Sequence, residues 1–137
     1  GFQPGMWSIS AAWGGTDHAR ARLLDYIGDP RTELVVGFFN ETLTAALAAR
    51  MAPALLVDVD VDLYSSTRTA LGWLLEHRLL RPGTVVGYDD WVQGGRAGEQ
   101  RAHYELARQY HVSFRRVKAS DQNWPSFSVQ AVGQAEL

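Results

Sequence analysis

The chain has 137 residues, 46% of them hydrophobic and 20% charged, with a formal net charge of −2. This composition predicts one globular domain and excludes an intrinsically disordered protein, while the balanced charge without a long basic run argues against nucleic acid as a partner. Disulfides, thiolate zinc sites and a cysteine nucleophile are excluded because the chain has no cysteine, and a membrane-spanning helix is excluded because no apolar run reaches about 18–20 residues.

The first third of the chain predicts two helices and one short strand. Proline and glycine interrupt residues 1–15, which predicts a loop. A helix is expected over residues 16–27, which begin with a Thr-Asp pair that can cap it. The Leu-Val-Val run within residues 33–38 predicts a buried strand, and the alanine-rich composition of residues 40–51 favours a second helix.

The rest of the chain alternates strands with helices and then ends in two strands. The expected elements are a strand over residues 55–60, a helix over 65–79, a strand over 84–88, a helix over 96–110, and strands over 112–117 and 127–132. Such alternation predicts an α/β fold with a mostly parallel sheet that helices cover on both faces. The short loop between the last two strands predicts an antiparallel hairpin.

Acidic residues follow two of these strands. Asp58, Asp60 and Asp62 alternate with valines, and the later acids are expected at or beyond the end of their strand, because burying three carboxylates would be very costly. Asp89 and Asp90 end the next strand at the same edge, where open α/β sheets bind ligands. Oxygen ligands without cysteine or histidine indicate a hard cation, Mg²⁺ first, with Mn²⁺ or Ca²⁺ as alternatives. The competing interpretation is that these residues only cap helices or form Asx turns.

The histidines and tryptophans give weaker indications. The histidines are interpreted as solvated or hydrogen-bonded surface residues: His18, His77, His103 and His111. Trp73 is expected in the core. Trp91, which follows the second group of acids, and Trp124, in the loop between the last two strands, suit the wall of a substrate pocket and packing under a loop equally well.

Three segments resemble the macrocin O-methyltransferase-like family. Residues 60–67 are Asp-Val-Asp-Leu-Tyr-Ser-Ser-Thr, where the family carries Asp-x-Asp-Leu-Tyr-x-Ser-Thr. Residues 82–90 are Pro-Gly-Thr-Val-Val-Gly-Tyr-Asp-Asp, similar to its Pro-Gly-Gly-x-hydrophobic-Asp-Asp segment, and residues 36–43 resemble its Lys-Gly-Trp/Phe-Phe-x-x-Thr-Leu segment. The resemblance implies a Rossmann-like class I methyltransferase that uses S-adenosylmethionine (SAM) and Mg²⁺ to methylate a hydroxyl of a sugar or another natural product.

The resemblance also implies roles for four aspartates. Asp60, Asp89 and Asp90 would bind the metal ion, and Asp62 would be the catalytic general base that takes the proton of the acceptor hydroxyl. The chain departs from the family at its valine 61, where glycine is common, and at Asp58, an additional acid whose part in the site the sequence leaves open.

The SAM-binding part of such enzymes has no counterpart in the sequence. It consists of a glycine-rich loop after a first strand and an acid that ends the second strand, and nothing before Leu34 resembles either feature. We therefore expect residues 1–137 to be the C-terminal part of a methyltransferase domain that lacks its first two strands, and no residue is assigned to SAM. The missing first strand would lie between strands 33–38 and 55–60, so the isolated chain is expected to be poorly stable or to form homo-oligomers through unpaired sheet edges.

Two other functions compete with this prediction. Residues 58–63 resemble the nucleophile motif of haloacid-dehalogenase-like Mg²⁺-dependent phosphatases, although that motif normally opens its domain. The second alternative is a non-catalytic methyltransferase fragment that packs against a partner. For the methyltransferase, we expect a cytoplasmic enzyme with a small-molecule hydroxyl acceptor and no nucleic-acid or membrane partner.

Overall fold

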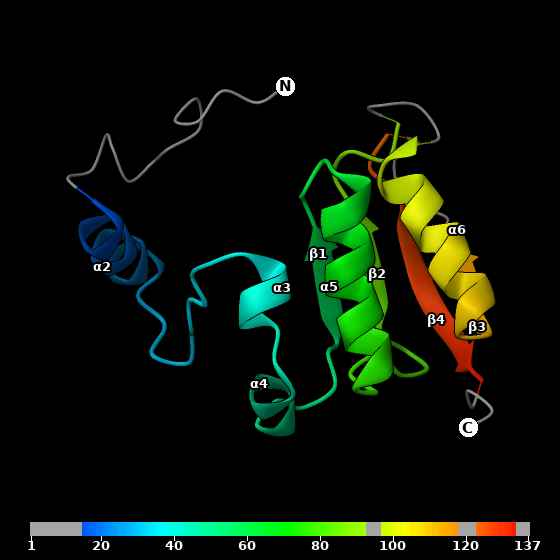
Figure 1. Cartoon of the computed structure of the whole chain (residues 1–137), viewed down its shortest axis with the longest axis horizontal. Helices are drawn as coiled ribbons and strands as arrows, with labels where there is room; N and C mark the ends of the chain where they lie inside the picture. Colours follow the sequence, from blue (N-terminus) through cyan, green and yellow to red (C-terminus); the bar gives the residue numbers. More distant parts are fainter. Residues whose placement is uncertain (1–14, 93–96, 118–122, 134–137) are drawn as a thin grey trace. The chain divides into compact units, whose positions relative to one another are not determined.

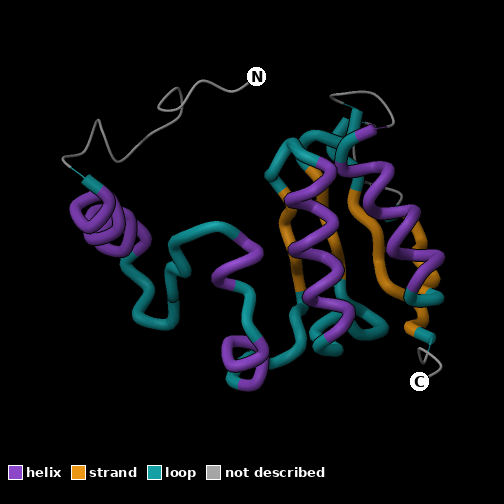
Figure 2. Tube along the Cα trace, in the orientation of Figure 1, coloured by secondary structure: helices purple, strands orange, loops and turns teal. Residues whose placement is uncertain are grey.

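The computed structural model describes residues 15–92, 97–117 and 123–133 (Figures 1 and 2). The chain divides into two compact units, Gly1–Val36 and Gly37–Leu137. In the described part of both units, no helix is long and apolar enough to cross a membrane.

The described part of the first unit contains the predicted helix α2 (Thr16–Ile27). Gly28 ends this helix in the left-handed conformation, with a φ of 64°, and its N–H donates to the Leu24 carbonyl. Glycine adopts this conformation without the steric cost of a Cβ atom, which explains why α2 ends where the sequence predicted.

The second unit contains a four-stranded sheet. Its elements are, in chain order, α3 (Phe39–Thr42), α4 (Ala45–Ala49), β1 (Leu56–Val59), α5 (Tyr64–Glu76), β2 (Val85–Tyr88), α6 (Glu99–Gln109), β3 (Val112–Arg116) and β4 (Ser126–Val132). The strands lie in the order β1-β2-β4-β3. β1 and β2 are parallel, whereas β4 pairs antiparallel with both β2 and β3, so the predicted hairpin is confirmed.

Apolar side chains from the sheet and from α5 and α6 form the main core. The two helices lie side by side on the same face of the sheet (Figure 1). Burial alternates along β1 and along the first part of β4, as expected when one face of a strand is covered, whereas three of the four residues of β2 are buried. The buried members of this core are Val59, Leu71, Leu75, Leu80, Val86, Tyr88, Trp91, Leu106, Val112, Phe127 and Val129.

A second, smaller apolar cluster lies where α4 meets the end of α5. The buried side chain of Trp73 contacts this cluster, which confirms its expected place in a core, and its indole N–H donates to the Thr44 carbonyl at 3.2 Å. Thr44 also caps α4, because its hydroxyl oxygen accepts the N–H of Leu47 at 3.1 Å. The single helix predicted over residues 40–51 is therefore wrong: Thr44 is extended, and two short helices replace it.

The strand predicted over residues 33–38 is also wrong. Residues 32–36 form neither helix nor strand, and Val35 and Val36 are about half exposed. A strand needs a neighbour to take its backbone hydrogen bonds, and β1 pairs only with β2 among the described strands. The apolar pattern of this segment thus lacks the partner strand that would turn it into a sheet element.

The sheet departs from the predicted mostly parallel arrangement. Among the described strands only the β1–β2 pair is parallel, because the strand expected over residues 33–38 is not formed and β4 pairs with β2 from the opposite direction. Within the described part of the second unit, the expectation of helices on both faces fails as well. α5 and α6 share one face, and the side chains of Leu56 and Asp58 on β1 are exposed on the other.

We predict that the isolated 137-residue chain associates in solution through the free edge of β1. Among the described strands β1 has no neighbour on this side, and Leu55 and Leu56 beside it are 88% and 67% exposed; such edges promote pairing with other chains. Sedimentation velocity should show concentration-dependent association that Leu56→Lys weakens. Val92→Lys, which changes an exposed valine outside β1, should leave the association intact. A stable monomer that unfolds cooperatively would contradict this prediction.

Candidate metal-binding and catalytic site

Three carboxylates gather where β1 and β2 end. The two strands are parallel and in register, with Val59 opposite Tyr88, and the backbone N–H of Asp89 extends the ladder by donating to the Val59 carbonyl at 3.0 Å. The segments that leave the two strands therefore start side by side. As a result, carboxylate oxygens of Asp60, Asp62 and Asp90 lie within 4.8 Å of one another.

This three-carboxylate group overlaps the predicted site without matching it residue for residue. Asp60 and Asp90, two of the expected metal ligands, lie together, and Asp62, the expected base, is the third member. Asp89, the other expected ligand, is exposed and lies outside the group. Asp58 lies outside it as well: its Oδ1 faces Gly87 of β2, 3.3 Å from where a Cβ at that glycine would be.

The backbone at Asp62 turns sharply between β1 and α5. Asp62 has a φ of 53°, in the left-handed region that few residues other than glycine, asparagine and aspartate adopt. The N–H of Leu63 donates to the carbonyl of Val61, which closes a three-residue turn around Asp62. This turn explains how Asp62 can join Asp60 although the strand has already ended, and uncommon backbone conformations of this kind concentrate at functional sites.

Helix α5 begins directly after this turn, at Tyr64. Leu63 occupies its capping position, and no side chain caps the helix. Thr67, which is fully buried, instead donates its hydroxyl to the Leu63 carbonyl at 2.9 Å. The start of α5 thus fixes the C-terminal side of the segment that carries Asp60 and Asp62.

The three-carboxylate group concentrates negative charge in a partly buried place. Only 5% of Asp90 is exposed. A hydrogen bond with the Asp62 side chain, burial, and the neighbouring charges of Asp62, Asp89 and Asp60 raise the pKa of Asp90 to about 6. A bound cation would stabilise the ionised carboxylates and remove most of this repulsion.

Glu99, the first residue of α6, lies against the same segments and was not singled out from the sequence. Its side chain is fully buried. Its Oε1 accepts the backbone N–H of Val61 at 3.3 Å, and its Oε2 accepts the backbone N–H of Asp90 at 3.1 Å. Burial raises the pKa of Glu99 to about 7, although the two backbone hydrogen bonds oppose this shift. The sequence signal that could have identified it is an acid in the first turn of the helix after the second acidic segment.

The tryptophan near the site packs in the core. Trp91 is buried and contacts the rings of Tyr88, His103 and Phe127, and it also lines a cavity of about 590 Å³ beside α6 and β3. Trp124 is 56% exposed. The interpretation of His103 as a surface residue is wrong. His103 is buried, its Nδ1 is hydrogen bonded to the Tyr88 hydroxyl at 2.8 Å, and burial lowers its pKa to about 4, so it is neutral at pH 7.

The other histidines agree better with the sequence interpretation. His18 and His111 are exposed. His77 is partly exposed, and its ring packs edge-on against that of Trp73. None of these three belongs to the three-carboxylate group.

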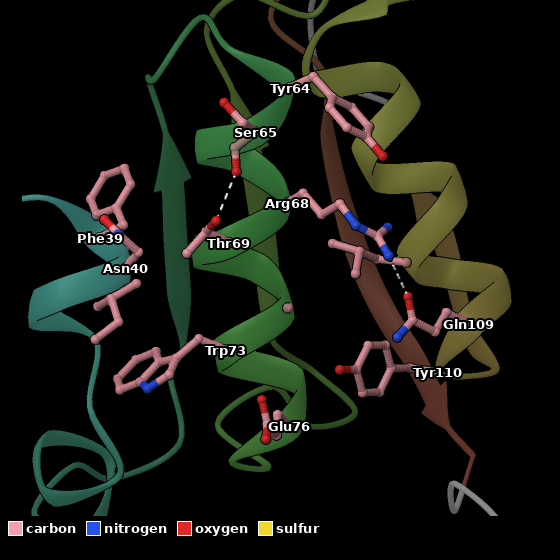
Figure 3. Close-up of a pocket in the computed structure, with 13 residues that line it drawn as sticks. Phe39, Asn40, Tyr64, Ser65, Arg68, Thr69, Trp73, Glu76, Gln109 and Tyr110 are labelled. Atoms are coloured by element: carbon pink, nitrogen blue, oxygen red, sulfur yellow. Dashed lines mark hydrogen bonds between the residues drawn. The ribbon is translucent and has the colours of Figure 1, made fainter.

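The largest opening beside α5 lies away from the acids. A groove of about 540 Å³ runs between α3, α5 and α6. Figure 3 shows Trp73 pointing toward the α3 side and Arg68 pointing toward α6, where its guanidinium donates to the Gln109 side-chain oxygen at 2.8 Å. The acids of the three-carboxylate group do not line this groove, so its geometry offers no support for chemistry at those residues.

Two solved structures have a similar fold. One is the O-methyltransferase NovP, with a TM-score of 0.67 and 19% sequence identity over 85% of this chain. The other is the apo structure of CalS11, a TDP-rhamnose 3'-O-methyltransferase of calicheamicin biosynthesis, with a TM-score of 0.62 and 22% identity over 84% of this chain. The chain spans about half of each, 46% of NovP and 52% of CalS11. No protein-family model and no curated protein matches the sequence.

These comparisons establish the type of fold. At such identities the similarity concerns only the arrangement of the chain in space. It shows that the mixed α/β fold of this chain resembles part of each of the two methyltransferase structures. Function does not follow from fold alone and has to be argued from the site.

We predict that the Asp90 and Glu99 carboxyls make the metal-free protein less stable as the pH rises from about 4 to 7. The pKa values of Asp90 and Glu99 are higher in the folded chain, about 6 and about 7, than their ordinary values of 3.8 and 4.5. Between the two values of each group the folded chain binds more protons at that group than the unfolded chain, so its contribution to the free energy of unfolding falls with rising pH across that window and levels off above it. The pKa of His103, which burial lowers to about 4, opposes part of this loss.

Urea unfolding of the wild type and of Asp90→Asn at several pH values tests this prediction. The stability of the wild type relative to Asp90→Asn should decrease from pH 4 to pH 6, because the variant lacks the titrating carboxyl. Adding Mg²⁺ or Mn²⁺ at pH 7.5 should stabilise the wild type more than the variant. A difference between the two proteins that is independent of pH would contradict the prediction.

Proposed function

We propose that the chain is part of a metal-dependent O-methyltransferase that transfers a methyl group from SAM to a hydroxyl of a sugar or another natural product. The observation that carries this proposal is the three-carboxylate group at the ends of the parallel strands β1 and β2. The fold supports it, because both similar structures are O-methyltransferases and one of them is named for a nucleotide sugar. Within this proposal, residues 1–137 form a partial methyltransferase domain.

The chemistry and spacing of the carboxylates fit a hard cation. Mg²⁺ binds oxygen ligands in an octahedron at about 2.0–2.1 Å, which places ligand oxygens roughly 3–4 Å apart. Carboxylate oxygens of Asp60 and Asp90 lie within 4.8 Å of each other, so they need only small side-chain adjustments to share such an ion, and Asp62 lies equally near to them. A Mg²⁺ ion bound here would lower the pKa of a substrate hydroxyl that it contacts.

Each aspartate has a proposed role. Asp60, Asp89 and Asp90 bind the ion, and Asp62 accepts the proton of the acceptor hydroxyl as the methyl group is transferred. Asp62 is suited to this role because it adjoins the proposed ligand Asp90 and sits on the turn that follows the strand. SAM would supply the electrophilic methyl group, and the residues that bind SAM are not assigned to this chain.

Activity measurements on the full protein discriminate between the competing functions. A methyltransferase should convert SAM in the presence of Mg²⁺ and a polyol or nucleotide sugar, and chelation of the metal should abolish turnover. Hydrolysis of a generic phosphomonoester without use of SAM would favour the phosphatase. Absence of both activities, with intact folding and metal binding, would favour a non-catalytic role.

We predict that Asp62→Asn lowers kcat by about 10²–10⁴-fold, the usual range for a lost general base. Asparagine tolerates the positive φ at this position and keeps the side-chain shape, so folding and metal affinity should change little. Steady-state kinetics and Mn²⁺ titration provide the two measurements. If the variant keeps near-normal kcat but loses metal affinity, Asp62 is a metal ligand and another group is the base.

We predict that Asp89→Asn weakens Mn²⁺ binding at least about tenfold, as expected for the loss of a ligand and its charge. Asp58→Asn is the matched control, since it removes the same charge from a residue that lies outside the three-carboxylate group. Isothermal titration calorimetry with Mn²⁺ measures both affinities. Equal, small changes for the two variants would mean that Asp89 affects the ion only through its charge and that Asp60, Asp62 and Asp90 hold it.

A further inference from the structure

Glu99 connects the two segments that carry the three-carboxylate group. Its two carboxylate oxygens accept backbone N–H groups on different segments, that of Val61 at 3.3 Å and that of Asp90 at 3.1 Å. Val61 lies between Asp60 and Asp62, and the second donor is Asp90 itself. One side chain thus contacts the backbone of both acidic segments.

Glu99 is also held firmly in place. It is fully buried and is the first residue of α6, an 11-residue helix that packs along α5 and the sheet. The N-terminal end of a helix favours a carboxylate, because the free N–H groups of the first turn carry partial positive charge. A buried carboxylate costs free energy unless hydrogen bonds compensate, and the N–H groups of Val61 and Asp90 supply them.

We propose that Glu99 is a positioning residue, which holds the backbone of the Asp60–Asp62 segment and of Asp90 at the separation that a shared divalent cation requires. Both of its oxygens are occupied by backbone N–H groups, and it lies outside the three-carboxylate group. It therefore acts through the backbone of the ligands, without contacting the ion. The inference about cation binding depends on the proposed function, whereas the inference about backbone position does not.

Two neutral variants separate positioning from charge. Glu99→Gln and Glu99→Met remove the same negative charge and have similar side-chain lengths, but glutamine keeps one acceptor oxygen and methionine keeps none of comparable strength. If Glu99 positions the segments, Mn²⁺ affinity should fall about tenfold in Glu99→Gln and about 100-fold in Glu99→Met, within the range for residues that orient metal ligands. Equal losses in the two variants would show that only charge matters and would overturn the proposal.

Glu105→Gln is the matched control on the same helix. Glu105 bonds the side chains of Tyr64 and Arg101, so its replacement disturbs the contact between α5 and α6 without touching the backbone of the acidic segments. Its Mn²⁺ affinity should remain within about threefold of wild type. A loss in this control as large as in Glu99→Met would also overturn the proposal, since any weakening of the helix would then have the same effect.

Amide hydrogen exchange, measured by NMR on the metal-free full protein, tests the backbone role independently of the ion. The amides of Val61 and Asp90 should both exchange at least about tenfold faster in Glu99→Met, and one of the two should stay protected in Glu99→Gln. Amides of the buried strand residues Val86 and Val129 report whether the variants remain folded. Unchanged exchange at Val61 and Asp90 would overturn the proposal.

The two sets of measurements also keep the two proposals apart. If the wild type binds no Mn²⁺, the proposed metal-dependent function fails, while faster exchange in Glu99→Met still supports the positioning role. If the wild type binds Mn²⁺ and the exchange rates do not change, the metal site stands and the role of Glu99 is wrong.

Discussion

The parallel, in-register pairing of β1 and β2 is the constraint on which the candidate site depends. Because Val59 lies opposite Tyr88, both strands end at the same level, and the acidic segments that follow them in the chain start side by side. A shift of one residue would turn every side chain of a strand to the other face, and the acids would no longer meet. The arrangement has an electrostatic cost, because a hydrogen bond with Asp62, burial and the neighbouring negative charges together raise the pKa of Asp90 to about 6.

Several contacts from the helices stabilise the acidic segments despite this repulsion. At the start of α5, the hydroxyl of Thr67 donates to the carbonyl of Leu63. At the start of α6, the carboxylate of Glu99 accepts hydrogen bonds from the backbone N–H groups of Val61 and Asp90. Thr67 and Glu99 are both fully buried. The site is therefore supported by the first turns of two rigid helices that pack on the same face of the sheet, which is how binding sites on α/β sheets are held in shape.

One edge of β1 has no neighbouring strand among the described residues. Leu55 and Leu56 expose apolar surface next to unpaired backbone groups, a combination that folded proteins normally cover. The chain covers about half of each of the two methyltransferase structures it resembles. Both facts fit the proposal that the described unit is part of a larger methyltransferase domain, in which this edge of β1 would be paired.

Local sequence signals determined the elements whose stability is local or depends on near neighbours. The local sequence patterns of α2, α5 and α6 and the short connection between β3 and β4 were sufficient to predict those elements, and the acids after two strands were sufficient to predict where carboxylates would gather. Tertiary structure alone decided the rest. The segment at residues 33–38 has the pattern of a strand but no neighbouring strand among the described residues to accept its hydrogen bonds, and the grouping of Asp62, and not Asp89, with Asp60 and Asp90 is seen only in the structure. Glu99 belongs to the candidate site because the start of α6 meets the segments that follow β1 and β2, and contacts between residues 38 positions apart cannot be read from local periodicity.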